Sequence, residues 1–282
     1  MPAVNELRPS PIAGTWYPGN PQRLASQVDA YLNEARLPKI DGEVIAVIAP
    51  HAGYIYSGPT AGYAFASVRG KTYSRVVLLS PLHGYHPAPF ITSAHHGYQT
   101  PLGPVWIDFE GLSALDEELE ARRLPGLDPI MHDKEHSLEI ELPFLQRALT
   151  GEFRLMPIMV RSHDPAQLFS LGQALAKILI QYPALLVAST DLSHFFPLEI
   201  ANQLDETMLQ NIVELSPQKA LLAEETGTGF ACGVGGVAAV LWAALALGSN
   251  TAQILHHSTS ADQTGDSSSV VGYGAAVVLK KA

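Results

Sequence analysis

The stretch EVIAVIAPHAGYIYSG, residues 43–58, carries the clearest strand signal in the chain. Its apolar, β-branched first half is followed by Pro50, His51 and a turn rich in glycine and tyrosine. A short apolar run that ends at Pro or Gly is typical of a strand buried on both faces. We therefore expect His51 to leave the carboxyl end of a buried strand, at the edge where open α/β sheets bind ligands.

The same pattern occurs three more times along the chain. Residues 75–80 precede His83, residues 154–160 precede His163, and residues 184–190 precede Asp191 and His194. Parallel strands place their carboxyl ends at one edge of a sheet, so these histidines are expected to gather there. This recurrence is the main functional signal in the sequence.

The composition limits the class of protein. The chain has 282 residues, of which 47% are hydrophobic and 16% charged, and this is typical of a folded α/β protein. A net charge of −10 disfavours nucleic acid and anionic membranes as main partners. Cys232 is the single cysteine, so no disulfide within the chain is expected.

Two features of the sequence bear on its expected localisation. The first twenty residues lack a basic segment followed by an apolar run, so no signal peptide is expected. The long apolar stretch at residues 230–247 is short for a membrane span and is expected to form a buried helix. We expect a cytoplasmic protein.

Strands and helices are predicted to alternate over most of the chain, which indicates a single-domain α/β sandwich with a mostly parallel, mixed central sheet over residues 1–282. Asn20 and Pro21 are a good start for the first helix. Extended segments at 86–93 and 99–109 suggest an antiparallel edge, and 253–258 and 270–279 are late strands. Residues 124–133 and the polar segment between the late strands are expected to be loops. Further helices are expected at 57–68, 111–123, 137–149, 165–181, 198–215 and 217–225.

Histidine and thiolate are ligands for zinc, iron and copper, so His51, His83, His194 and Cys232 are candidates for a metal site. Taken singly, each histidine is better explained as a hydrogen-bonding loop residue, and Cys232 is explained equally well as a small buried side chain or as a thiolate at a helix N-terminus. Their expected placement at one sheet edge favours a site.

Other polar residues leave two interpretations open. Asp191 can orient the imidazole of His194 or cap the helix that follows. Glu135, His136 and the acidic residues after them can line a site or simply suit a helix N-terminus. Tyr54, Trp16 and Tyr17 can contact a ligand or pack in the core. The pairs at 95–96 and 256–257 have no matching carboxylate in the sequence and receive no role.

Several motifs occur together in a fixed order: GTWYPG, PHAGYIYSG, LSPLHG, EHSLEIELPF, STDLSHF, ACG and DSSSVVGYGA. In this order the chain resembles the Memo family. The resemblance implies one α/β domain similar to the class III extradiol ring-cleaving dioxygenases. It also implies a metal held by two histidines and a cysteine, here His51, His83 and Cys232, with Asp191 and His194 beside it.

These observations lead to a first hypothesis of an iron-dependent, dioxygenase-like oxidoreductase that acts on a small aromatic, catecholic molecule with O₂. His194 would be the acid/base, oriented by Asp191. Residues expected to line the substrate pocket are Tyr54, Glu135, His136, Trp16 and Tyr17. The alternatives are a metal- or ligand-binding adaptor with a degenerate pocket, for which copper bound through Cys232 is an option, and a zinc hydrolase.

Overall fold

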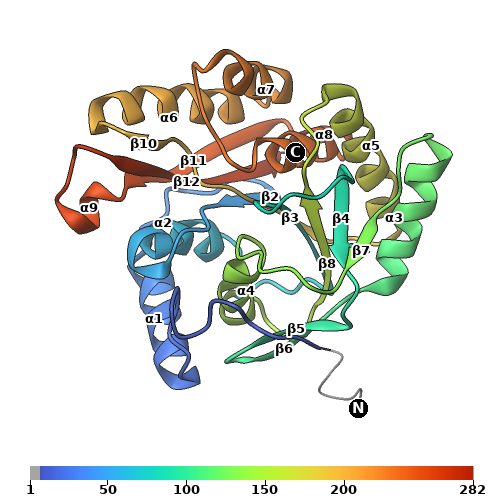
Figure 1. The fold of residues 1–282 in the computed structure, drawn as a ribbon, viewed down its shortest axis with the longest axis horizontal. Helices are drawn as coiled ribbons and strands as arrows, with labels where there is room; N and C mark the ends of the chain where they lie inside the picture. Colours follow the sequence, from blue (N-terminus) through green and yellow to red (C-terminus); the bar gives the residue numbers. More distant parts are fainter. Residues whose placement is uncertain (1–6, 282) are drawn as a thin grey trace.

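Four parallel strands form the centre of the fold in the computed structural model, which describes residues 7–281 (Figure 1). They neighbour one another in the order β2 (Glu43–Ala49), β9 (Leu185–Ser189), β3 (Arg75–Pro81) and β8 (Arg154–Val160). These are the four apolar runs that precede histidines. The parallel register places all four carboxyl ends at one edge of the sheet, as the sequence predicted.

Antiparallel strands extend this sheet on both sides. β12 (Val270–Lys280) pairs with β2, and both β10 (His194–Phe196) and β11 (Thr251–Thr259) pair with β12. At the other end β4 (Phe90–Ser93) pairs with β8 and β7 (Asp128–Ile130) pairs with β4. The result is a mixed sheet of nine strands among the described residues, so the predicted mixed α/β fold is confirmed.

A second sheet of three strands lies apart from the first. It holds β1 (Leu7–Arg8), β5 (Gly97–Thr100) and β6 (Gly103–Trp106), and β5 and β6 are antiparallel. Of the two segments expected to form an antiparallel edge, 86–93 contains β4, which is antiparallel to β8 near the edge of the main sheet, whereas 99–109 contributes to this second sheet. Arg8 anchors β1, because its buried guanidinium lies 2.5 Å from Asp133 and 2.7 Å from Glu139.

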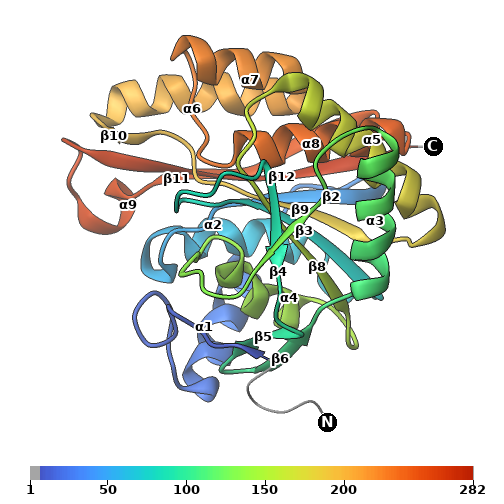
Figure 2. The same cartoon turned by 45° about the vertical axis from the view of Figure 1, so that its right-hand side comes forward.

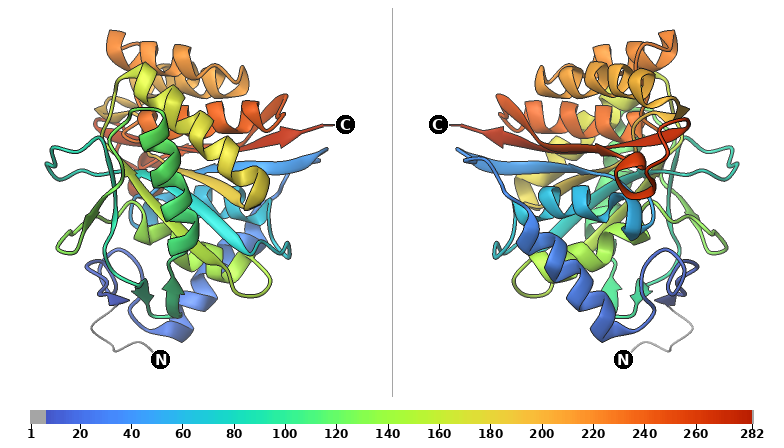
Figure 3. Two further views of the ribbon diagram at one scale, coloured as in Figure 1. Left: turned by 90° about the vertical axis from the view of Figure 1, so that its right-hand side faces the viewer. Right: turned by 90° about the vertical axis from the view of Figure 1, so that its left-hand side faces the viewer.

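Helices cover both faces of the main sheet, which is seen edge-on in Figure 3. One layer holds α5 (Pro165–Gln181), α6 (Leu198–Val213), α7 (Pro217–Thr226) and α8 (Val234–Ala246), and the other holds α1 (Pro21–Glu34), α2 (Tyr54–Ala66) and α4 (Leu142–Ala148). α3 (Phe109–Ala121) packs against α5 at the margin (Figure 2). None of the helices among residues 7–281 has the length and hydropathy needed to span a bilayer.

Local signals explain where several helices begin. The Asn20 side chain accepts a hydrogen bond from the Arg23 amide, and Pro21 occupies the first turn of α1, as predicted. The apolar stretch before residue 247 forms α8, which is buried along most of its length because it lies between the sheet and α5.

Three local predictions were wrong. Residues 137–149 do not form one helix: a 3₁₀ turn, Glu139–Glu141, precedes α4, and Pro143 lies in the first turn of α4. His136 and Glu139 therefore do not share a helix face. The two segments expected to be loops contain β7 and a short helix, α9 (Ala261–Thr264). A strand of three residues that pairs with a distant strand, or a helix of a single turn, can form without a clear pattern in its own sequence.

Gly172 tests the contact between α5 and α8. A Cβ atom at this position would lie 2.6 Å from the Trp242 Cβ and 2.8 Å from the Ala239 carbonyl oxygen. Alanine in a helix interior is normally favoured over glycine by about 1 kcal/mol. Overpacking costs about 1–3 kcal/mol, and contact with backbone places this cost near the upper end. After subtraction of the gain in helix propensity, we expect Gly172→Ala to lower the free energy of unfolding by about 1–2 kcal/mol. Urea denaturation measures this change, with Ser170→Ala on the same helix as the control. A more stable Gly172→Ala protein would contradict the close approach.

Candidate metal centre

The carboxyl ends of the central strands open into a cavity of about 740 Å³. Its wall includes the imidazoles that follow β2 and β3, namely His51 and His83, together with His136 and His194. His51 is only 1% exposed, so the cavity reaches from the protein surface to a buried imidazole.

Three of these imidazoles form a compact cluster. Each of His51, His83 and His136 offers a ring nitrogen, and these nitrogens lie within 4.8 Å of one another. The His83 and His136 rings are stacked with centroids 4.7 Å apart, and both rings lie edge-on to His51. An ion that bonds imidazole nitrogens at about 2.0–2.1 Å requires them to lie no more than about 4.2 Å apart, so the cluster could hold a metal ion after small movements of its rings.

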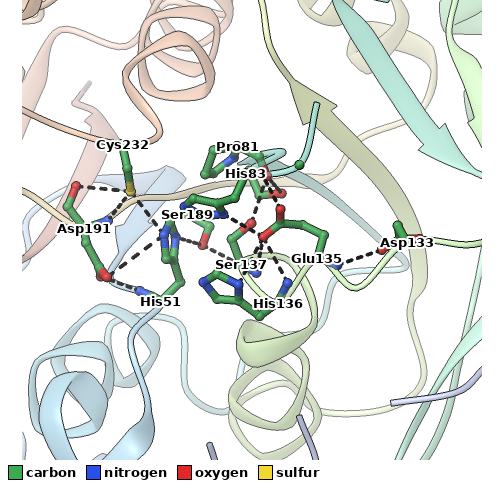
Figure 4. Close-up of polar contacts among 12 residues, drawn as sticks. His51, Pro81, His83, Asp133, Glu135, His136, Ser137, Ser189, Asp191 and Cys232 are labelled. Atoms are coloured by element: carbon green, nitrogen blue, oxygen red, sulfur yellow. Dashed lines mark hydrogen bonds and ion pairs between the residues drawn. The ribbon is translucent and has the colours of Figure 1, made fainter. Parts of the chain in front are cut away.

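Glu135 holds two members of the cluster in place (Figure 4). Its carboxylate accepts hydrogen bonds from the His83 Nδ1 at 2.9 Å, from the His83 amide at 2.6 Å and from the His136 amide at 2.9 Å. Burial raises the pKa of Glu135, but the hydrogen bonds from His83 and from Ser137 outweigh it and leave the pKa below its usual value. The hydrogen bond to Glu135 raises the pKa of His83. With Nδ1 engaged, the Nε2 of His83 is the nitrogen left for a metal.

Ser189 plays the same part for His51. The Ser189 hydroxyl donates toward the Ser137 carbonyl at 2.7 Å and lies 3.0 Å from the His51 Nδ1. We assign the Nδ1 proton of His51 to this contact, which leaves a lone pair on Nε2. Burial lowers the pKa of His51 well below its usual value, so its imidazole is neutral, the form that binds a metal.

His136 was expected to line the substrate pocket, and the structure places it inside the imidazole cluster. It belongs to the segment that leads into the 3₁₀ turn, and the Trp16 ring covers it with centroids 4.2 Å apart. Burial lowers the pKa of His136 to about 4. The only signal in the sequence was its place next to Glu135, which is too common a pair to identify a ligand.

Cys232 lies against His51 and outside the group of three imidazoles (Figure 4). Its Sγ is 3.1 Å from the His51 Nε2, and the Asp191 amide donates to the sulfur at 3.3 Å. Burial raises the pKa of the Cys232 thiol. The predicted cysteine is therefore adjacent to the cluster through His51, and a metal on His51 would lie close to its sulfur.

Asp191 faces His51 and does not orient His194. One carboxylate oxygen accepts the His51 amide at 2.7 Å, and the other lies 4.0 Å from the His51 Nε2. Burial raises the pKa of Asp191 to about 7. The Nδ1 of His194 instead lies 2.8 Å from the Leu192 carbonyl oxygen. The expectation that Asp191 fixes the His194 ring, or caps the next helix, is corrected, because α6 begins after Pro197.

The predicted aromatic residues divide into two groups. Trp16 lines the cavity, as expected. Tyr54 and Tyr17 do not line it: the Tyr54 hydroxyl donates to the Ile140 carbonyl at 2.8 Å, and the Tyr17 hydroxyl donates to Glu139 at 2.7 Å. Both rings are buried, so their place is in the core.

Two other histidines differ from the sequence interpretation. His163 follows β8 but is exposed and does not line the cavity. His257, which had no carboxylate partner in the sequence, lies 2.8 Å from the fully buried carboxylate of Asp205. Asp205 also accepts the Ser193 amide at 2.9 Å, so it connects His257 to the residue before the strand that carries His194.

Comparisons with known proteins cover nearly the whole chain. A family model described as "Memo-like protein" matches residues 8–277. The chain belongs to the Memo family. The family resemblance drawn from the sequence motifs is therefore confirmed, and the imidazole cluster and Cys232 all lie inside the matched region.

Relatives within the Memo family are similar over nearly their full length. A "MEMO1 family protein" of Nitrosopumilus maritimus is 33% identical over 275 residues, covering 95% of this chain and 98% of the relative. One from Aquifex aeolicus is 33% identical over 267 residues, covering 95% and 97%. One from Thermotoga maritima is 33% identical over 282 residues, covering 95% and 98%.

Glu135 gives a direct test of how the cluster is held. Glu135→Gln keeps the size of the side chain but removes the charge that accepts from His83. Loss of such a carboxylate behind a metal-binding histidine typically lowers metal affinity by about 10–100-fold, and we expect a loss in this range. Calorimetric titration with Zn²⁺ under one buffer condition measures it. The exposed Glu199→Gln is the matched control, and equal affinity of both variants would contradict the role of Glu135.

Proposed function

We propose that this Memo family protein is a mononuclear metal-dependent oxidoreductase, with iron as the ion and a small aromatic, catecholic molecule and O₂ as substrates. The chemistry would then resemble that of the class III extradiol dioxygenases. The observation that carries the proposal is the cluster of three imidazole nitrogens within 4.8 Å on the wall of a 740 Å³ cavity. A few protein ligands that leave coordination positions open are what non-haem iron oxygenases require.

The donor set of the site fits a metal ion on two grounds. The Nδ1 atoms of His51 and His83 are engaged by Ser189 and Glu135, so both rings present Nε2. Such support fixes the ring and its tautomer for metal binding. When bound, an iron ion supplies Lewis-acid and electron-transfer chemistry. The other residues of the site would bind and orient the substrate and exchange protons with it.

His194 is the proposed acid/base. Its Nδ1 must donate to the Leu192 carbonyl, which only accepts, so Nε2 is free to take a proton. Burial lowers the pKa of His194, so the neutral ring is ready to accept a proton at neutral pH. Since His194 and the imidazole cluster line the same cavity, a hydroxyl group bound there could lose its proton to His194.

Cys232 favours a second candidate, a non-catalytic protein that sequesters copper. A thiolate is a soft ligand that suits Cu(I), and the Sγ atom lies 3.1 Å from the His51 Nε2. In that case His51 and Cys232 would both bind the copper ion, and the cavity would be a degenerate enzyme pocket without activity. The third ligand, His136 or Cys232, therefore distinguishes the two functions.

Metal content after anaerobic purification tests the ligand set. We expect His51→Ala, His83→Ala and His136→Ala to lose stoichiometric iron, and Cys232→Ser to retain most of it, since the three imidazoles alone form the cluster. His163→Ala is the matched control, because this histidine also follows a central strand and is exposed. Retention of iron in His136→Ala together with its loss in Cys232→Ser would reject the three-imidazole set.

Turnover separates the enzyme from the adaptor. O₂ uptake by the iron-loaded protein is measured with a panel of catechols, and we expect His194→Ala to lower its rate by about 10²–10⁴-fold at unchanged iron content. Glu199→Gln serves as the control. Stoichiometric copper with no O₂ uptake would favour the adaptor, and a His194→Ala rate equal to that of the wild type would remove His194 from the reaction.

A further inference from the structure

The cavity has two chemically different ends. His51 and Asp191 line the buried end, where they are 1% and 4% exposed, and His83 is exposed. The wall also carries large apolar side chains that face solvent, Phe195 at 74% and Tyr56 at 37%, whereas Trp16 packs on the His136 ring. Large apolar side chains exposed together at a cavity mouth mark a binding surface.

Phe195 is held at this mouth by an irregular backbone. Its φ of +65° lies in the left-handed region, which a bulky residue seldom adopts. It is the residue between His194 and Phe196, where the pairing of β10 with β12 shifts register. A bulge of this kind redirects a side chain, and here it leaves a phenylalanine exposed beside His194.

Apart from its histidines, the cavity wall carries acidic and no basic side chains among the described residues. Within the described chain, no lysine or arginine lines this cavity, whereas Asp191 and Asp266 both do. The cavity therefore offers no guanidinium or ammonium group to a carboxylate or phosphate, and the net charge of −10 adds to the negative potential.

Asp266 is the carboxylate of the exposed end. Its Oδ1 accepts both the amide and the hydroxyl of Ser268, at 2.9 and 2.7 Å. These hydrogen bonds lower the pKa of Asp266, so the carboxylate is ionised at neutral pH. Among residues 7–281, no side chain or amide is hydrogen-bonded to Oδ2, and no lysine or arginine pairs with Asp266. One carboxylate oxygen is thus free to accept from a ligand.

We infer that the exposed end of the cavity is a subsite for an alkylammonium group, recognised by the carboxylate of Asp266 and the ring faces of Tyr56 and Phe195. Aromatic faces attract cations, and a nearby carboxylate completes such a site. The subsite narrows the substrate class of the proposed function, on which this inference rests, to aromatic amines. The aromatic ring would lie toward the imidazoles, and the ammonium group would lie at the mouth of the cavity.

Binding of matched ligands tests the subsite without turnover. The first series is 2-phenylethylamine, 2-phenylethanol and 3-phenylpropionate, which share a phenyl ring and differ in the charge of the tail. Calorimetry with the protein as purified, at low ionic strength, gives each Kd. We expect the amine to bind about tenfold more tightly than the acid, with the alcohol between them. The preference should shrink as salt is added.

Variants assign the preference to named side chains. Asp266→Asn should weaken amine binding about two- to fivefold, and Asp266→Lys should abolish or reverse the preference for the amine over the acid. Phe195→Leu keeps the apolar bulk but removes the ring, and should weaken the amine about two- to fivefold and the alcohol less. Asp41→Asn, an exposed aspartate away from the cavity wall, is the matched control and should leave every Kd unchanged.

A second series separates the subsite from the proposed reaction. Dopamine and 3-(3,4-dihydroxyphenyl)propionate are compared for O₂ uptake by the iron-loaded protein. A charge preference in the phenyl series without O₂ uptake from either catechol supports the subsite and removes the proposed function. O₂ uptake with equal or tighter binding of the acids supports the function and overturns the subsite. No measurable binding in the phenyl series, or an amine preference that Asp266→Lys leaves intact, also overturns the subsite.

Discussion

The parallel register of β2, β9, β3 and β8 is the constraint on which the site depends. Neighbouring strands lie only about 4.8 Å apart, so residues that follow adjacent strands at one edge are forced close together. His51 and His83 follow β2 and β3, which flank β9, and the loop after β9 carries Asp191. Burial of these strands between two helix layers restrains the register, because a slip would disrupt the close packing of both faces against the helices. The sheet therefore supplies the precision that a metal site requires.

A second set of contacts fixes the orientation and the tautomers of the histidines at this edge of the sheet. Glu135 accepts from the His83 ring, from the His83 amide and from the amides of His136 and Ser137. Ser189, from β9, connects His51 to the Ser137 carbonyl. One short segment before the 3₁₀ turn thus supports all three imidazoles. A buried carboxylate with this many donors is stabilised in its charged form in spite of its burial, and its charge would balance the positive charge of an ion held by the imidazole cluster.

The cavity in front of this centre combines rigid and irregular backbone. Its buried end is built from strand ends, whereas its mouth uses the bulge at Phe195 and the segment around α9 that carries Asp266. In many α/β proteins the reacting residues are positioned by the sheet, and the residues that select the ligand lie on connecting segments. In this chain the buried His51 lies at the strand ends, and the exposed Phe195 and Asp266 lie on the connecting segments.

Local sequence was sufficient for the four central strands, the cap of α1, the buried α8 and the presence of histidines at the strand ends. These features depend on patterns within a few residues, and the order of the motifs identified the Memo family. Only the tertiary structure decided which side chains meet. It placed His136 in the imidazole cluster, Asp191 against His51, Tyr54 and Tyr17 in the core, and His163 outside the cavity. The physical reason is that these outcomes depend on strand order, on the path of the segment before the 3₁₀ turn and on a bulge, which join residues distant in sequence and leave no periodic signal in the residues themselves.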